Sequence, residues 1–221
     1  TGSRYGQTFI NPFAKNTNTY IVFSKKDAVR NNMAAFHCEV VDTNTVNLSK
    51  ASVASPKFID GGILRRYRLG VAATVEYSEY HWLAAGLTAG NTDADKKDAV
   101  QTAIVVTIDR VNQVYERDLG ITLELIANNR DVIYLGDANN DPYTDSSSTA
   151  LINENQTVFD AVILTGNYDI GHVFSTGGGG LASTPSVCNS NAKARGVTGQ
   201  GNPVGDSFDI DFVAHEIGHQ F

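Results

Sequence analysis

The chain has 221 residues, of which 42% are hydrophobic and 19% are charged, and its net charge is −7. This length allows one large domain or one domain with a small appendage, and the composition excludes a disordered chain. The negative charge argues against nucleic-acid binding, which needs a basic surface, and no apolar run approaches the ~18 residues of a membrane helix.

Residues 1–63 differ in character from the rest of the chain. They are rich in Asn, Thr and Ser, with short apolar alternations at 20–23 and 36–41 that predict short strands. Turn-forming residues at 55–57 and 60–62 mark a joint. We therefore divide the chain into a β-rich N-terminal segment, 1–63, and a main segment, 64–221.

The main segment opens with a predicted strand at 67–77 and a long helix at 93–118. The helix can be capped by Thr92 or Asp93 at its start, and Gly120 stands just past its end. Its apolar side chains repeat every three or four positions and predict one buried stripe: Val100, Ala103, Ile104, Thr107, Val111 and Val114.

The remaining elements are shorter. Residues 121–126 alternate as a strand, and 131–135 predict another before a turn-rich stretch at 136–148. The apolar run 159–165 predicts a central strand covered on both faces, and 172–175 extends the sheet. A glycine run follows at 177–180, and a last helix is expected to begin near Ser207.

That last helix carries the sequence His215-Glu216-Ile217-Gly218-His219, an H-E-x-x-H motif. Helix positions four apart share a face, so His215 and His219 can offer imidazole nitrogens to one zinc ion. Glu216 can accept a proton from the water that the zinc activates. Gly218 is a poor helix former, and its small size would let a neighbouring backbone approach closely. The alternative is an exposed helix with two unrelated histidines.

The motif, the residues before it (209–214) and the upstream stretch 115–120 resemble bacterial reprolysin-like metallo-endopeptidases, which are adamalysin-type metzincins. The resemblance covers about residues 64–221. It implies an α/β (α+β) fold, in which a twisted mixed sheet with two long helices forms an upper subdomain. It also implies zinc as cofactor, His215 and His219 as ligands, Glu216 as general base, a polypeptide substrate and secretion.

The full metzincin signature continues to a further Gly, a third His and a methionine turn. The printed sequence ends at Phe221, and its methionine, Met33, lies far upstream. The resemblance therefore implies a third zinc ligand beyond residue 221, and we expect zinc binding and proteolysis by the printed chain to be impaired without it. A downstream Glu ligand would indicate a thermolysin-like gluzincin instead. An incidental motif would leave a non-catalytic binding or propeptide-type module.

The resemblance also places Gly179, Gly180, Leu181 and Ala182 near an edge strand that pairs with extended substrate. A flexible surface loop is an equal alternative for the glycine run.

Cys38 is a candidate zinc-blocking thiolate, because related latent enzymes use a propeptide thiolate in this way and a thiolate is a strong zinc ligand. Residues 1–63 would then be a propeptide that lies over the active site. The alternatives are a buried cysteine or a disulfide with Cys188.

Two further patterns are weaker. Residues 137–141 begin like a calcium loop, but Pro142 and Ser148 stand where an EF-hand needs Gly and Glu. We therefore predict a turn and assign no calcium site. His37, His81 and His172 are isolated in the sequence and are expected to be surface or packed histidines rather than ligands.

Overall fold

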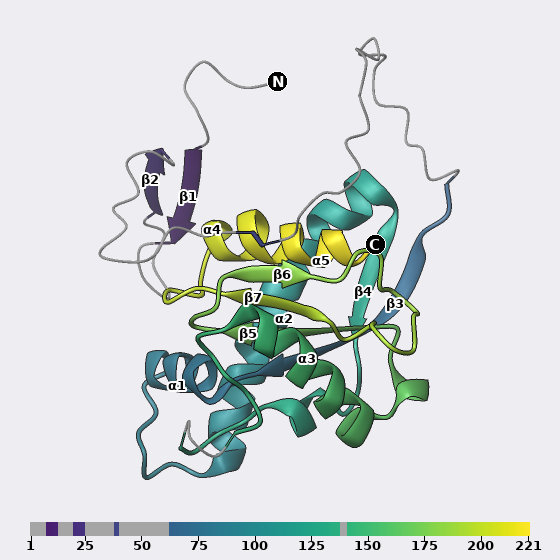
Figure 1. Cartoon of the computed structure of the whole chain (residues 1–221). Helices are drawn as coiled ribbons and strands as arrows, with labels where there is room; N and C mark the ends of the chain where they lie inside the picture. The colour runs from purple at the N-terminus through teal and green to yellow at the C-terminus, as the bar shows by residue number, and fades with distance from the viewer. Residues whose placement is uncertain (1–7, 13–19, 25–37, 40–61, 138–140) are drawn as a thin grey trace.

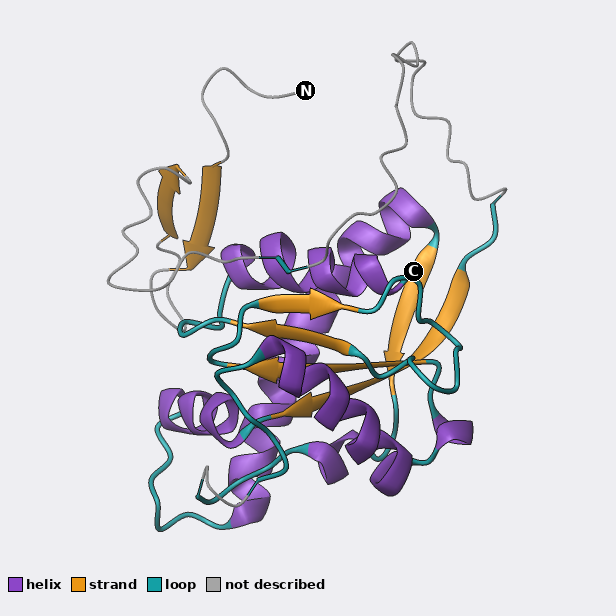
Figure 2. Ribbon diagram, in the orientation of Figure 1, coloured by secondary structure: helices purple, strands orange, loops and turns teal. Residues whose placement is uncertain are grey.

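The computed structural model describes residues 8–12, 20–24, 38–39, 62–137 and 141–221. A five-stranded sheet with the order β4-β3-β5-β7-β6 lies at its centre (Figures 1 and 2). The parallel strands are β3 (Arg65–Ala73), β4 (Ile121–Leu125), β5 (Ile170–Ser175) and β7 (Gly196–Gly199). The edge strand β6 (Gly180–Ala182) is antiparallel to β7. This mixed sheet with its helices confirms the predicted fold class.

Helices cover both faces of the sheet, and each face has its own core. Side chains of α2 (Asp93–Leu119) and α5 (Ala214–Gln220) pack against Leu69, Val71 and Phe174. On the other face, α3 (Ser148–Val158) packs against Ala72 and Val173. Neighbouring strand residues thus serve opposite faces, as the two-residue period of a strand requires.

The long helix and the strand after it were predicted correctly. Thr92 caps α2 by accepting a hydrogen bond from the backbone N–H of Asp95 at 3.2 Å. Gly120 ends the helix in the left-handed conformation, with φ of 64°. Val100, Ile104 and Val111 of the predicted stripe are fully buried, because the helix packs its apolar face on the sheet.

The central strand was predicted in the wrong place. Residues 159–165 form a π-helical turn, η3 (Phe159–Ile163), and a 3-10 turn, η4 (Thr165–Asn167). The central strand is β5, which is buried along its whole length. A short apolar run fits a buried helix as well as a strand, and here it continues directly from α3.

Two other predicted strands also need correction. The strand predicted at 67–77 ends at Ala73, because the Thr74 side chain caps a new helix, α1 (Val75–Ala84). Residues 131–135 contribute one bridge, from Ile133 to Ala73, after the 3-10 turn η2 (Asn129–Val132). Neither α1 nor α3 was predicted, because no regular apolar stripe marks them.

In the N-terminal segment, the strands β1 (Thr8–Pro12) and β2 (Tyr20–Ser24) pair antiparallel, which confirms the strand predicted at 20–23. Of the strand predicted at 36–41, the structure describes Cys38 and Glu39. The boundary proposed near residue 63 follows residues 40–61, which lie outside the described residues, and it stays a prediction. No described helix is both long and apolar enough to cross a membrane.

Candidate metal centre

The H-E-x-x-H motif lies at the end of a continuous helical segment. It begins with α4 (Asp206–Phe208), passes through a π-helical turn, η5 (Asp209–Val213), and ends with α5. The last helix therefore begins where the sequence predicted it. π-Helical turns inside helices occur frequently at functional sites, and this one ends two positions before His215.

Asp209 anchors the start of this segment to α2. The residue is 3% exposed, and its carboxylate accepts a hydrogen bond from the Thr107 hydroxyl at 2.8 Å and pairs with Arg110 Nε at 2.9 Å. Burial raises the pKa of Asp209, while Thr107 and Arg110 lower it. The directional contacts fix η5 on the long helix.

A second contact with α2 lies at the motif itself. The Tyr115 hydroxyl donates a hydrogen bond to the carbonyl of Ala214 at 2.6 Å. A Cβ at Gly218 would lie 3.3 Å from the same hydroxyl oxygen. Gly218 does permit a close approach, but by a side chain and not, as predicted, by a neighbouring backbone.

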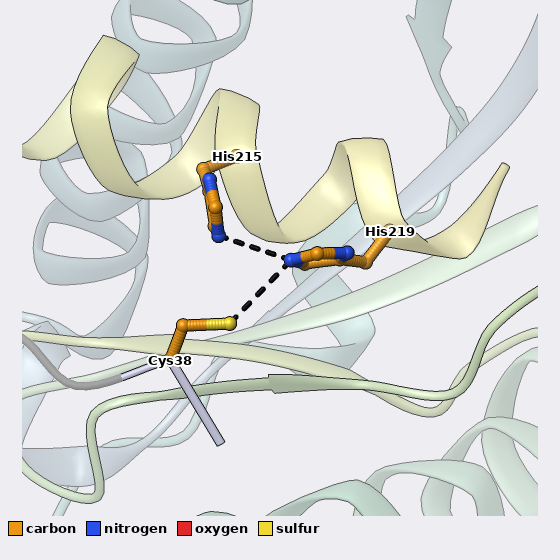
Figure 3. A group of neighbouring side chains, drawn as sticks. All are labelled: Cys38, His215 and His219. Carbon is orange, nitrogen blue, oxygen red and sulfur yellow. Dashed lines mark hydrogen bonds between the residues drawn. The ribbon is translucent and has the colours of Figure 1, made fainter. Parts of the chain in front are cut away.

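The two motif histidines face one another. Their Nε2 atoms are 3.0 Å apart, and their ring planes are nearly perpendicular, at 87°. His215 is exposed and His219 is half-buried. Figure 3 shows both rings directed away from the helix toward a common region, so the helical spacing places two imidazole donors side by side.

Glu216 lies on the buried side of the same helical turn. It is 0% exposed, and its Oε1 lies 4.0 Å from Nε2 of His215. Burial raises the pKa of Glu216 to about 7; the nearby Cys38 thiol lowers it and the charge of Glu39 raises it. A carboxyl group with a pKa near neutrality can both accept and release a proton.

Cys38 is distant from the motif in the sequence but lies beside its histidines in the structure. Its Sγ lies 3.4 Å from Nε2 of His219, as Figure 3 shows. The donor atoms of Cys38, His215 and His219 all lie within 4.8 Å of one another. Neither Cys38 nor Cys188 forms a disulfide, so the alternative bridge between them is not present.

The segment that carries Cys38 runs beside β6. Cys38 forms a parallel bridge with Gly180, and the backbone N–H of Glu39 donates to the Gly180 carbonyl at 2.9 Å. The Glu39 carboxylate accepts a hydrogen bond from the Ser148 hydroxyl, at the first residue of α3. Cys38 and Glu39 therefore occupy the outer edge of β6.

The glycine run before β6 is closely packed. A Cβ at Gly177 or Gly178 would lie 2.9 Å or 3.1 Å from the carbonyl oxygen of Asp145. The Gly179 carbonyl accepts a hydrogen bond from Gly199 N–H at 2.8 Å. These contacts explain why glycines stand at 177 and 178, where a side chain would meet Asp145. Gly180, Leu181 and Ala182 form the edge strand β6.

The sequence profile of the Metallo-peptidase family M12B, Reprolysin-like, matches residues 101–221, from within α2 through the motif. The chain belongs to this family. A search of curated proteins found no match. The M12B match confirms the predicted resemblance to reprolysin-like peptidases, and this family implies zinc as cofactor and polypeptides as substrates.

The residues of this M12B chain fit a zinc ion. Imidazole nitrogen and thiolate sulfur are preferred zinc donors. Tetrahedral zinc with nitrogens at 2.0–2.1 Å would hold them about 3.3 Å apart, which is close to the observed 3.0 Å between the histidines. The Cys38 Sγ lies at a similar distance from His219, so the three donors can meet at one ion.

The two other histidines that the structure describes, His81 and His172, lie away from the motif, as expected. His172 is fully buried and bonded to Thr198 and Gln220, so it does not serve as a third ligand in this structure. His81 is 8% exposed and packs on the Tyr77 ring, with 4.4 Å between ring centroids. His37 lies outside the described residues.

The predicted turn at 137–141 is supported at its end. Asp141 accepts hydrogen bonds from the backbone N–H groups of Val75 at 3.0 Å and Tyr143 at 3.2 Å. Its carboxylate thus caps the start of α1. Residues 138–140 lie outside the described residues, and no calcium site is assigned.

Two residues near the site were not predicted from the sequence: Ser148, which contacts Glu39, and Gln220, which follows His219 and contacts His172. A serine pair at 147–148 is a recognisable helix start, but nothing local links it to Glu39. Gln220 directly follows a motif histidine, and an amide on the inner face of a helix is a signal of a buried polar contact.

Proposed function

We propose that this M12B protein is a zinc-dependent endopeptidase in which His215 and His219 hold the metal and Glu216 is the general base. The paired Nε2 atoms, 3.0 Å apart beside a buried carboxylate, carry this proposal. When bound, zinc polarises the scissile carbonyl and makes water nucleophilic near neutral pH. Glu216 accepts the proton of the attacking water and then delivers it to the leaving amine.

The substrate is proposed to bind as an additional strand along β6. The outer edge of this strand already pairs with Cys38 and Glu39 through the backbone of Gly180. The Gly180 carbonyl and the other backbone groups of this outer edge can bind an extended polypeptide beside the histidines. Gly179, Gly180, Leu181 and Ala182 would then orient the scissile bond.

We further propose that residues 1–63 act as a propeptide, with Cys38 as the zinc-blocking thiolate. Cys38 lies where it could contact the metal, and its neighbour Glu39 occupies the edge that the substrate needs. A chain held in this way would be latent until the segment is displaced. Secretion, which is usual for the family, is part of the same proposal.

Replacing Glu216 with Gln tests the assignment of the base. The amide keeps the shape of the side chain but cannot accept the proton, so cleavage of a quenched fluorescent polypeptide should fall by about 10²–10⁴-fold. The matched control is Glu79→Gln, on the exposed face of α1, which should leave the rate unchanged. Zinc content, measured by mass spectrometry, should be the same in all three proteins.

Two results would contradict the proposal. Cleavage retained by Glu216→Gln would exclude Glu216 as the base. Full-length protein that includes the expected third ligand, yet binds no zinc and cleaves no polypeptide, would favour the non-catalytic binding module instead. The M12B match already favours a reprolysin-like enzyme over the thermolysin-like alternative.

A further inference from the structure

Three polar side chains form a buried group behind the metal centre. They are His172 of β5, Thr198 of β7 and Gln220 of α5, and each is 0% exposed. Gln220 directly follows the proposed ligand His219. The proposed reaction uses none of the three, so their burial needs another explanation.

The hydrogen bonds of this group can be assigned a direction. Gln220 Nε2 donates to the carbonyl of Gly171 at 3.0 Å, which turns Oε1 toward Nδ1 of His172 at 2.9 Å. An amide oxygen only accepts, so Nδ1 of His172 carries the proton. Nε2 of His172 then accepts from the Thr198 hydroxyl at 2.8 Å. Burial lowers the pKa of His172 to about 4, in keeping with this neutral tautomer.

The backbone next to this group leaves room for its side chains and also binds Gln220. A Cβ at Gly196 would lie 2.4 Å from Oε1 of Gln220 and 2.5 Å from Nδ1 of His172, so a glycine leaves the necessary room. The Gln220 carbonyl accepts hydrogen bonds from the N–H groups of Ser186 at 2.7 Å and Val187 at 3.0 Å. Gln220 is thus fixed to the sheet by its side chain and to the 186–187 loop by its backbone.

These contacts hold the C-terminal turn of α5. α5 has seven residues, His219 is in its last turn, and the last carbonyls of a helix have no partner within it. Apolar packing alone resists sliding and rotation of a helix poorly, whereas hydrogen bonds are directional.

We propose that His172 and Gln220 are positioning residues that hold the last turn of α5, so that His219 keeps its distance from His215. This inference rests on the proposed zinc site, but it does not require that the site be catalytic. Their effect would pass through the helix backbone and not through contact with metal or substrate. Thr198 supports His172 in the required tautomer.

Cobalt binding to the full chain tests this proposal without an activity assay. The Co²⁺ affinity and visible absorption spectrum report the arrangement of the ligands. Gln220→Leu and His172→Leu should weaken cobalt binding by about tenfold or more, as is typical when groups that orient ligands are lost. Because either variant could fail to fold, the milder Thr198→Val should shift affinity in the same direction by a smaller factor.

Two controls separate positioning from general stability. His172→Asn keeps an N–H near the position of Nδ1 and should restore affinity close to that of the wild type. Val173→Ala removes a buried side chain from the other face of the sheet, so it should lower the unfolding temperature without changing cobalt affinity.

The outcomes are distinct. Wild-type cobalt affinity and spectrum in folded Gln220→Leu and Thr198→Val proteins would overturn the positioning role while leaving the zinc site intact. Failure of the wild-type protein to bind cobalt or zinc would overturn the proposed function and this inference with it.

Discussion

Gly218 stands between the two motif histidines and faces the Tyr115 hydroxyl. This hydroxyl is held by a 2.6 Å hydrogen bond to Ala214, so it cannot move aside freely. Tyr115 is 3% exposed, and burial raises its pKa, which keeps it a donor at all ordinary pH. The glycine therefore has a specific reason to be in the helix despite its low propensity.

A double-mutant cycle of Gly218→Ala and Tyr115→Phe tests whether the Tyr115 hydroxyl limits the size of residue 218. Alanine favours the helix by about 1 kcal/mol, but its Cβ would lie 3.3 Å from Oη of Tyr115. We expect Gly218→Ala to change stability little in the wild type and to stabilise Tyr115→Phe by about 1 kcal/mol. Urea unfolding of the four proteins measures the coupling. Strictly additive effects would show that the tyrosine does not constrain position 218.

At the scale of elements, the motif helix depends on α2 for its position. Asp209 begins the π-helical turn and is the buried member of an ion pair with Arg110. Removing the cation would leave a buried carboxylate, which is costly because its desolvation is no longer compensated.

Arg110→Met should therefore destabilise the protein by about 2–4 kcal/mol, at the lower end because Arg110 is about one-third exposed. Replacing both members, as Arg110→Met with Asp209→Leu, should recover part of this loss, since no charge is then left buried. Thermal and urea unfolding provide the comparison. A double variant less stable than Arg110→Met would contradict the argument.

The elements differ in how far the sequence could predict them. α2 was clear because Val100, Ile104 and Val111 follow the helical period and Gly120 marks its end. The turn at 159–163 could not be recognised from the sequence, because an apolar stretch of this length has no period that distinguishes a buried helical turn from a strand. The strand predicted at 172–175 is part of β5, which lies at the centre of the sheet and not at an extension of it.

The residues alone predict the site only where it is local. The spacing of His215 and His219 on one helix predicts their proximity. Cys38 was a candidate zinc-blocking thiolate only through the family resemblance, because it lies 181 positions from His219 and no local pattern links the two. The same holds for Gln220, whose partners lie on β5 and β7.

At the scale of the whole molecule, the N-terminal segment and the metal centre meet through Cys38. A contact that stabilises the closed arrangement by only ~1.4 kcal/mol would reduce the open fraction tenfold. We therefore expect Cys38→Ser to raise the rate of polypeptide cleavage by at least that factor.

Cys188→Ser, at an exposed site, is the matched control and should leave the rate unchanged. Alkylation of the wild-type thiols should activate the enzyme as Cys38→Ser does. Equal rates for the wild type and Cys38→Ser would exclude the thiol as the block.

The response of stability to acid also belongs to the whole molecule, because buried groups with opposite effects contribute. Burial lowers the pKa of His172 and of His81 to about 4, below their ordinary value near 6.5. Between these values the unfolded chain binds more protons, so the neutral histidines contribute stability above pH 6.5 that is lost as the pH falls toward 4. The raised pKa values of Glu216 and Asp209 act in the opposite direction.

Comparison with His172→Asn isolates one of these contributions. The free energy of unfolding of the variant, relative to the wild type, should rise by up to about 3 kcal/mol between pH 6.5 and pH 4, because the variant has no buried imidazole to protonate. Glu216, Asp209 and His81 are common to both proteins and cancel in the difference. Val173→Ala should show a difference that is flat with pH. A flat difference for His172→Asn as well would mean that His172 titrates normally in the folded protein, which its bonds to Thr198 and Gln220 and its complete burial do not allow.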